Sequence, residues 1–153
     1  EVLTVDGDRF TERDLLAAAP AVLTLYRGWW CPASKVQLDG LMDDLARLGA
    51  GGYRVFALSV DDPEDSAWLG GHVGEAATVL CGADDRLLDA FGSRDARGVR
   101  WYTQKLDGEP PHDIARPTTF VIDEGGAITY VHRSTRIDER SGLGGILAEA
   151  EAT

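Results

Sequence analysis

Sulfur, positive charge and long hydrophobic runs are all scarce in this sequence. The 153 residues include two cysteines, so at most one disulfide bridge could form and a disulfide-stapled secreted fold is not indicated. The chain carries 15 lysines and arginines against 26 aspartates and glutamates, and its net charge of -11 should repel nucleic acid and anionic membranes. No run of about 20 apolar residues is present to span a membrane. Neither nucleic acid nor membrane is therefore an expected partner.

Metal and phosphate motifs are missing as well. The three histidines are scattered, and none sits at ligand spacing from a cysteine. The glycine pairs at 51–52 and 70–71 precede no lysine and helix of a phosphate-binding loop. We therefore expect no metal and no cofactor.

What is present fits a single globular domain. Hydrophobic residues make up 44% of the chain, which is enough for a core of ordinary size. No internal repeat or low-complexity linker divides residues 1–153, so we expect one domain. Because the chain begins at Glu1 rather than methionine, the loss of a preceding targeting segment stays open. The cytoplasm is the default location.

Strand-like and helix-like patterns alternate along most of the chain, which is typical of an α/β protein. Residues 93–116 break this alternation and are predicted to be a long loop with room for a small hairpin. Strands are predicted at residues 3–5, 21–25, 53–60, 77–80, 117–122 and 127–131, and helices at 15–19, 32–48, 84–91 and 140–150 and after Asp61. The strand at residues 3–5 is expected at an edge of the sheet, and residues 11–14 resemble a capping box that opens the helix at 15–19.

The stretch around which the chain is organised is residues 26–34, Tyr-Arg-Gly-Trp-Trp-Cys-Pro-Ala-Ser. Cys31 falls at the N-cap of the helix that follows the strand, with Pro32 at the first helical position, where proline is favoured. Free backbone N–H groups and the positive end of the helix dipole then favour the thiolate. A partly exposed thiol in such a place is reactive. We therefore predict Cys31 as the functional group, the alternative being an inert thiol.

This stretch resembles the active site of the thioredoxin-like superfamily. The closest resemblance is to its peroxiredoxin-like branch, the alkyl hydroperoxide reductase/thiol-specific antioxidant (redoxin) family. Members carry Tyr-Arg-Gly-x-Trp-Cys-Pro-x-Cys, and this chain has every element except the last, where Ser34 stands. The resemblance runs from about Leu3 to Leu147. It implies a thioredoxin-like α/β fold in its peroxiredoxin-like variant, with a central mixed β-sheet flanked by helices, and a thiol-dependent redox activity.

A second motif, residues 116–123, begins Arg-Pro-Thr-Thr-Phe. A proline at the start of a strand is tolerated only where its missing donor is not needed. In the proteins that this chain resembles, the proline that matches Pro117 is cis, faces the active-site cysteine and lies in a loop whose backbone can pair with a substrate chain. The resemblance thus places Pro117 at the site. The side chains that it would set against a substrate are those of Arg27, Trp30, Arg116 and Thr118.

The loss of the second cysteine leaves several interpretations open. Ser34 cannot resolve a mixed disulfide, so Cys31 should form long-lived adducts or need an external thiol to turn over. Ser34 is either a small native residue or a resolving cysteine that was replaced to trap one redox state. Cys81 follows a strand whose carboxyl end should lie on the same side of the sheet as Cys31. It is either a distant resolving thiol or a small buried residue.

Peroxide reduction makes a separate demand. Peroxiredoxins proper use Pro-x-x-x-Thr-x-x-Cys and a later arginine, and these slots fall on Arg27, Cys31, Ser34 and Pro117 here, without one match. Two classes of function remain. One is an oxidoreductase acting through Cys31 on a protein or low-molecular-weight disulfide or on a peroxide. The other is a non-catalytic thioredoxin-like module that binds a partner through the Pro117 loop. Either could be a monomer or a homodimer.

We predict that Ser34→Cys converts the chain into a dithiol oxidoreductase that turns over. Ser34 lies three residues after Cys31, so both side chains fall on one face of the first helical turn and two sulfurs there would meet. The present chain should instead accumulate mixed disulfides. The measurement is reduction of insulin or glutathione disulfide by both proteins, with mass spectrometry of trapped adducts. Equal turnover by the serine protein would contradict the prediction and move the resolving role to Cys81.

Overall fold

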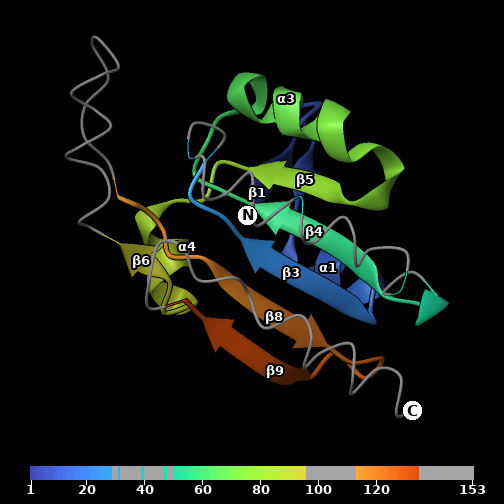
Figure 1. Cartoon of the computed structure of the whole chain (residues 1–153). Helices are drawn as coiled ribbons and strands as arrows, with labels where there is room; N and C mark the ends of the chain where they lie inside the picture. The colour runs from blue at the N-terminus through green and yellow to red at the C-terminus, as the bar shows by residue number, and fades with distance from the viewer. Residues whose placement is uncertain (29–30, 32–38, 40–46, 48–49, 96–112, 135–153) are drawn as a thin grey trace, which may run out of the picture.

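The computed structural model of the chain describes residues 1–28, 31, 39, 47, 50–95 and 113–134 (Figure 1). The side chains of Trp30 and Ser34 and the predicted helix at residues 140–150 lie outside this part of the chain. Most of the predicted helix at 32–48 lies outside it too, although its described positions Asp39 and Arg47 are helical.

A mixed seven-stranded β-sheet forms the centre of the described structure, as predicted (Figure 1). Its strands lie in the order β2-β1-β5-β4-β3-β8-β9. They are β1 (Val2–Thr4), β2 (Arg9–Phe10), β3 (Ala21–Leu25), β4 (Arg54–Leu58), β5 (Thr78–Cys81), β8 (Thr118–Ile122) and β9 (Ile128–Arg133). β3, β4 and β5 run parallel, whereas β8 is antiparallel to β3 and β9 to β8. The carboxyl ends of the three parallel strands therefore meet at one edge of the sheet.

Helices cover both faces of this sheet (Figure 1). They are α1 (Glu12–Ala17), α3 (Pro63–Val73) and α4 (Asp85–Ala90). Leu69 of α3 belongs to one apolar cluster with Val22 of β3. Leu88 of α4 belongs to a second cluster with Leu25, which lies on the opposite face of the same strand. β3 is thus buried on both sides, which agrees with the continuous apolar run at residues 21–25.

Polar side chains set where the helices begin. The predicted capping box of α1 is confirmed, because the Thr11 hydroxyl accepts a bond from the Asp14 N–H and the Asp14 carboxylate accepts one from the Thr11 N–H at 2.8 Å. The helix begins at Glu12 rather than at the expected Leu15, since Thr11 is its N-cap. Asp62 caps α3 in the same way, with the Asp65 N–H 2.8 Å from its carboxylate.

Some predicted boundaries were wrong for reasons of long-range pairing. β1 was expected at the edge of the sheet, but it lies between β2 and β5. β4 ends at Leu58, two residues early, because the Ser59 carbonyl instead accepts a bond from the Ala83 N–H across the sheet edge. Within the predicted loop at residues 93–116, β6 (Arg94–Asp95) pairs antiparallel with β7 (Ile114–Ala115), and the residues that join these strands, 96–112, lie outside the described part of the chain.

We predict that Leu25→Ala lowers the free energy of unfolding by about 2–5 kcal/mol, because it opens a cavity beside the fully buried central strand. Ile128→Ala removes the same number of carbon atoms from β9, where the side chain is 56% exposed. This control should cost about 0.5 kcal/mol or less. Urea unfolding of both variants makes the comparison, and equal losses would contradict the packing described here.

Candidate active site

The chain between β3 and Cys31 is held at successive points. The Tyr26 N–H donates to the Leu58 carbonyl at 3.0 Å and so extends the β3–β4 pairing by one residue. The next residue, Arg27, is tied through its side chain, and Gly28 then takes a φ of 154°, a conformation that favours glycine. The Cys31 N–H donates to the Gly28 carbonyl at 3.2 Å and closes a turn. Cys31 therefore lies on a tight turn at the carboxyl edge of the sheet.

The thiol of Cys31 is free but buried. The residue is 3% exposed, and no disulfide joins it to Cys81. The expectation of a partly exposed thiol is therefore wrong. The helix start at Pro32 lies outside the described residues, so the N-cap role of Cys31 stays a prediction.

Arg27 forms a buried ion pair that the sequence did not reveal. Its guanidinium donates to the Asp95 carboxylate at 3.0 Å, and the two side chains are 10% and 5% exposed. Arg27 is therefore not a surface charge. Asp95 was missed because it falls in the predicted loop at residues 93–116. The one available signal was the general rule that a buried arginine requires a carboxylate partner.

Cys81 is fixed at the end of β5 by bonds to the neighbouring strand β1. It is fully buried, and its thiol donates to the main-chain carbonyls of Leu3 at 3.4 Å and Thr4 at 3.6 Å. Burial raises the pKa of the Cys81 thiol, against a smaller opposing effect of the Ser66 hydroxyl. This environment keeps the sulfur protonated and unreactive, which favours the interpretation of Cys81 as a small buried residue.

A buried phenol lies behind the turn. Tyr26 is fully buried, and burial raises the pKa of its hydroxyl far above the usual range, so the phenol stays neutral. The nearby hydroxyls of Ser59 and Ser66 oppose this rise, whereas the Asp61 carboxylate adds to it. Asp61 is itself 8% exposed, and its carbonyl accepts a bond from the Gly82 N–H at 2.8 Å. Tyr26 thus belongs to the same apolar cluster as Val22 and Leu69, and its hydroxyl lies near those of Ser59 and Ser66.

The Pro117 loop is not an open binding edge. The cis peptide bond in the described residues is Ala19–Pro20, so the expectation of a cis bond before Pro117 is wrong. Backbone bonds hold the segment on both sides: the Ser134 N–H donates to the Pro117 carbonyl at 2.9 Å, and the Arg116 N–H donates to the Ser93 carbonyl at 2.6 Å. These bonds fix the path of the backbone between β7 and β8.

The hydroxyl of Thr118 is also engaged. It donates to the Arg116 carbonyl at 2.9 Å and lies 2.8 Å from the Ser93 hydroxyl. Pro117 and Thr118 are buried, whereas Arg116 is half-buried. Arg27 and Cys31 share the loop after β3, and Pro117 and Thr118 join β7 to β8. Thr118 pairs with Leu25 in the β3–β8 register, so the two segments lie side by side where β3 ends.

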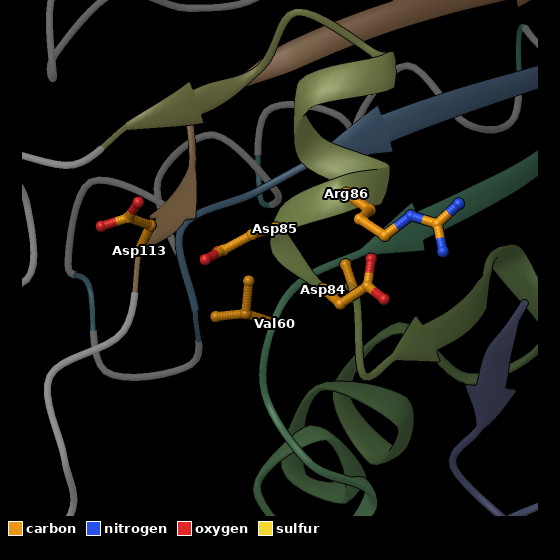
Figure 2. Close-up of a pocket in the computed structure, with 6 residues that line it drawn as sticks. Val60, Asp84, Asp85, Arg86 and Asp113 are labelled. Atoms are coloured by element: carbon orange, nitrogen blue, oxygen red, sulfur yellow. The ribbon is translucent and has the colours of Figure 1, made fainter.

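A cavity of about 410 Å³ opens at the carboxyl ends of β4 and β5 (Figure 2). Figure 2 shows Asp85 and Asp113 on one side of it and Asp84 and Arg86 on the other, with Val60 between them. None of the predicted site residues lines it. Its acidic residues have structural tasks, since Asp84 caps α4 and Asp113 pairs with Arg94. No cluster of metal-binding side chains occurs among the described residues.

Comparisons with known proteins place the chain in a wider context. The model of the AhpC/TSA family matches residues 1–131. No curated protein matches the chain. The crystal structure of peroxidoxin BcpB from Mycobacterium tuberculosis is 20% identical with a TM-score of 0.76, over 99% of this chain and 91% of that one. Reduced Prx3 from Vibrio vulnificus is 20% identical with a TM-score of 0.77, over 98% and 92%.

A third similar structure is the bacterioferritin comigratory protein of Xanthomonas campestris, studied for alkyl peroxide reduction. It is 17% identical with a TM-score of 0.74, over 99% of this chain and 89% of that one. At such identities the likeness shows the fold alone. The predicted thioredoxin-like α/β fold, in its peroxiredoxin-like variant, is confirmed. No helix in the described part of the chain is long and apolar enough to cross a membrane.

We predict that the stabilising effect of Cys81 weakens at alkaline pH. Below about pH 8.5 the thiol is protonated in both folded and unfolded states. Above it the unfolded chain loses a proton that the folded protein retains, because the folded pKa is raised, so stability falls as pH rises. The free-energy difference between the wild type and Cys81→Ala should therefore narrow from pH 7 to pH 10. Urea unfolding measures it.

The matched control for this prediction is Val79→Ala, which removes a buried non-titrating side chain from the same strand. Its free-energy difference from the wild type should not change with pH. A Cys81→Ala difference that is equally constant would contradict the burial of a protonated thiol.

Proposed function

Since this chain belongs to the AhpC/TSA family of peroxiredoxin-like thiol oxidoreductases, we propose that it is a one-cysteine enzyme in which Cys31 reduces a small hydroperoxide. An external thiol then restores the cysteine. The observation that carries the proposal is the contrast between the two sulfurs. Cys31 lies on a turn at the carboxyl edge of the sheet, whereas Cys81 is bonded to β1 and kept protonated.

The burial of Cys31 favours a small oxidant. A disulfide bond to a protein substrate brings two sulfurs to about 2.05 Å and two Cα atoms to about 6 Å. A thiol that is 3% exposed offers little room for a second polypeptide at that distance. A hydroperoxide needs only its terminal oxygen to reach the sulfur. The same restriction favours a low-molecular-weight thiol as the reductant, and we place the reaction in the cytoplasm, where such thiols are plentiful.

The proposed reaction is balanced over three steps. The Cys31 thiolate attacks the terminal oxygen of the hydroperoxide, the O–O bond breaks, and the alkoxide takes a proton to leave as an alcohol. The sulfur is then a sulfenic acid. A first external thiol condenses with the sulfenic acid to a mixed disulfide and releases water. A second external thiol attacks this mixed disulfide, frees Cys31 and leaves as part of an external disulfide.

Ser34 supports an external rather than an internal resolving step. It stands where the resembling proteins carry a second cysteine and has no sulfur to attack the oxidised Cys31. Trp30, beside the thiol in the sequence, is proposed to shield the site. If Ser34 stands in place of a replaced cysteine, the first step is the same and an external thiol is still needed.

Disulfide exchange by Cys31 is a second candidate. The observation that favours it is that none of the four peroxiredoxin slots is matched by its usual residue in this chain. Glutathione disulfide is small enough to meet the restriction set by burial. A binding module using the Pro117 loop is the weaker alternative, because the backbone groups on both sides of that proline are already hydrogen-bonded within the chain.

We predict that Cys31→Ser lowers turnover by at least about 1000-fold, because it removes the attacking sulfur. Cys81→Ser should keep turnover within about twofold of the wild type. One arm of the assay follows the consumption of reduced glutathione in the presence of tert-butyl hydroperoxide. The other arm follows the consumption of glutathione disulfide in the presence of dithiothreitol. Turnover in the first arm supports peroxide reduction and turnover in the second alone supports disulfide exchange. Loss of turnover in Cys81→Ser but not in Cys31→Ser would overturn the assignment.

A further inference from the structure

We propose that Asp95 is a positioning residue for Cys31: it holds the Arg27 guanidinium and thereby fixes the loop that carries the thiol. The inference rests on the proposed function, because it concerns the same cysteine. The direct evidence is the bond of 3.0 Å between the two charged side chains. Both are nearly excluded from water, with 10% and 5% of their side-chain surfaces exposed.

Burial makes this pair an obligatory one. Moving a charged group out of water costs several kcal/mol, and the cost is offset only when an opposite charge and good geometry are present. Removing either partner takes a buried counter-charge away from the other, which costs free energy. The Arg27 side chain therefore has one strongly favoured position, the one in which it meets Asp95.

Backbone bonds hold the segment that carries Asp95. It is the last residue of β6 and is paired with Ile114 of β7. Just before β6, the Ser93 N–H donates to the Leu88 carbonyl of α4 at 2.8 Å, and the Ser93 carbonyl accepts the Arg116 N–H. The backbone that carries this carboxylate is thus bonded to α4, to β7 and to the start of β8. A side chain bonded to it is tied to the body of the protein.

Arg27 stands at the start of the segment that needs such a tie. β3 ends at Leu25, and the Tyr26 N–H makes the last backbone bond to β4. Gly28, the residue after Arg27, has a φ of 154° and a wide choice of conformations. The Cys31 N–H then bonds to the Gly28 carbonyl. Gly28 would by itself allow the turn to change conformation. The Arg27–Asp95 ion pair restrains the residue next to it.

Arg27 lies four residues before Cys31 in the chain, so we also expect the charges of the pair to act on the thiol. A guanidinium close to a thiol favours the thiolate, and a carboxylate opposes it. Other charged groups on the described neighbouring elements include Asp61 after β4, Arg116 before β8, and Arg94 on β6, which bonds to Asp89 at 2.9 Å and to Asp113. With these unchanged, loss of Asp95 charge and loss of Arg27 charge must act on Cys31 in opposite directions. A purely structural role would not produce opposite signs.

The experiment uses the full chain with Cys81→Ser, so that Cys31 is the only thiol. Asp95→Asn, Arg27→Gln and the double variant are alkylated with iodoacetamide between pH 4 and 10. The expected midpoint of the rate falls to lower pH in Asp95→Asn, rises in Arg27→Gln and returns close to the parent in the double variant. Turnover at saturating substrate should fall by about tenfold or more in both single variants, since the turn is no longer held. Asp89→Asn, an exposed carboxylate bonded to Arg94, is the matched control and should change neither quantity.

Two outcomes would overturn the proposal: midpoints that do not move, or midpoints that move in the same direction in both single variants. If either single variant fails to fold, Arg27→Lys and Asp95→Glu preserve the charges and alter only the geometry. They should keep the parent midpoint but lose turnover, and unchanged turnover would equally overturn the proposal. Alkylation needs no turnover, so a wild type that reduces neither substrate defeats the proposed function and leaves this test intact.

Discussion

The burial of β3 at the centre of the sheet is the constraint on which the rest of the site depends. Its backbone is bonded to β4 on one side and to β8 on the other, and its side chains pack on both faces. A strand held in this way has no freedom of register, because a shift by one residue would exchange its two faces. The residue at which the chain leaves the sheet is therefore determined, and with it the starting point of the loop that carries Cys31.

From that starting point, the loop needs few further restraints. The Tyr26 N–H prolongs the pairing with β4, the Arg27–Asp95 ion pair ties the next residue to β6, and a turn places Cys31. The two cysteines then differ for a physical reason. Cys81 ends a strand whose neighbour offers it carbonyl acceptors in a buried setting, whereas Cys31 follows a strand and stands at the edge where parallel strands end. Cys81 has a structural setting, and Cys31 is the sulfur that we propose reacts.

Features set by neighbouring residues could be predicted from the sequence. The capping box at Thr11 and the buried strand at residues 21–25 depend on local side chains and were confirmed. The Arg27–Asp95 pair could not be predicted, because its partners are 68 residues apart and meet only when β6 is placed. The expectation of a cis bond before Pro117 was wrong, and the bonds that hold this segment, from Arg116 to Ser93 and from Ser134 to Pro117, also join residues far apart in the sequence. The roles predicted for Ser34 and Trp30 stay predictions, because both side chains lie outside the described residues.

The central claim is that the first chemical step occurs on Cys31 alone, and trapping that step tests it most directly. The wild-type protein is exposed to one equivalent of tert-butyl hydroperoxide together with dimedone, which labels sulfenic acid, and is then digested for peptide mass mapping. The account predicts a dimedone adduct on the peptide that contains Cys31 and an unmodified Cys81 peptide. An adduct on Cys81 with Cys31 unmodified would contradict it.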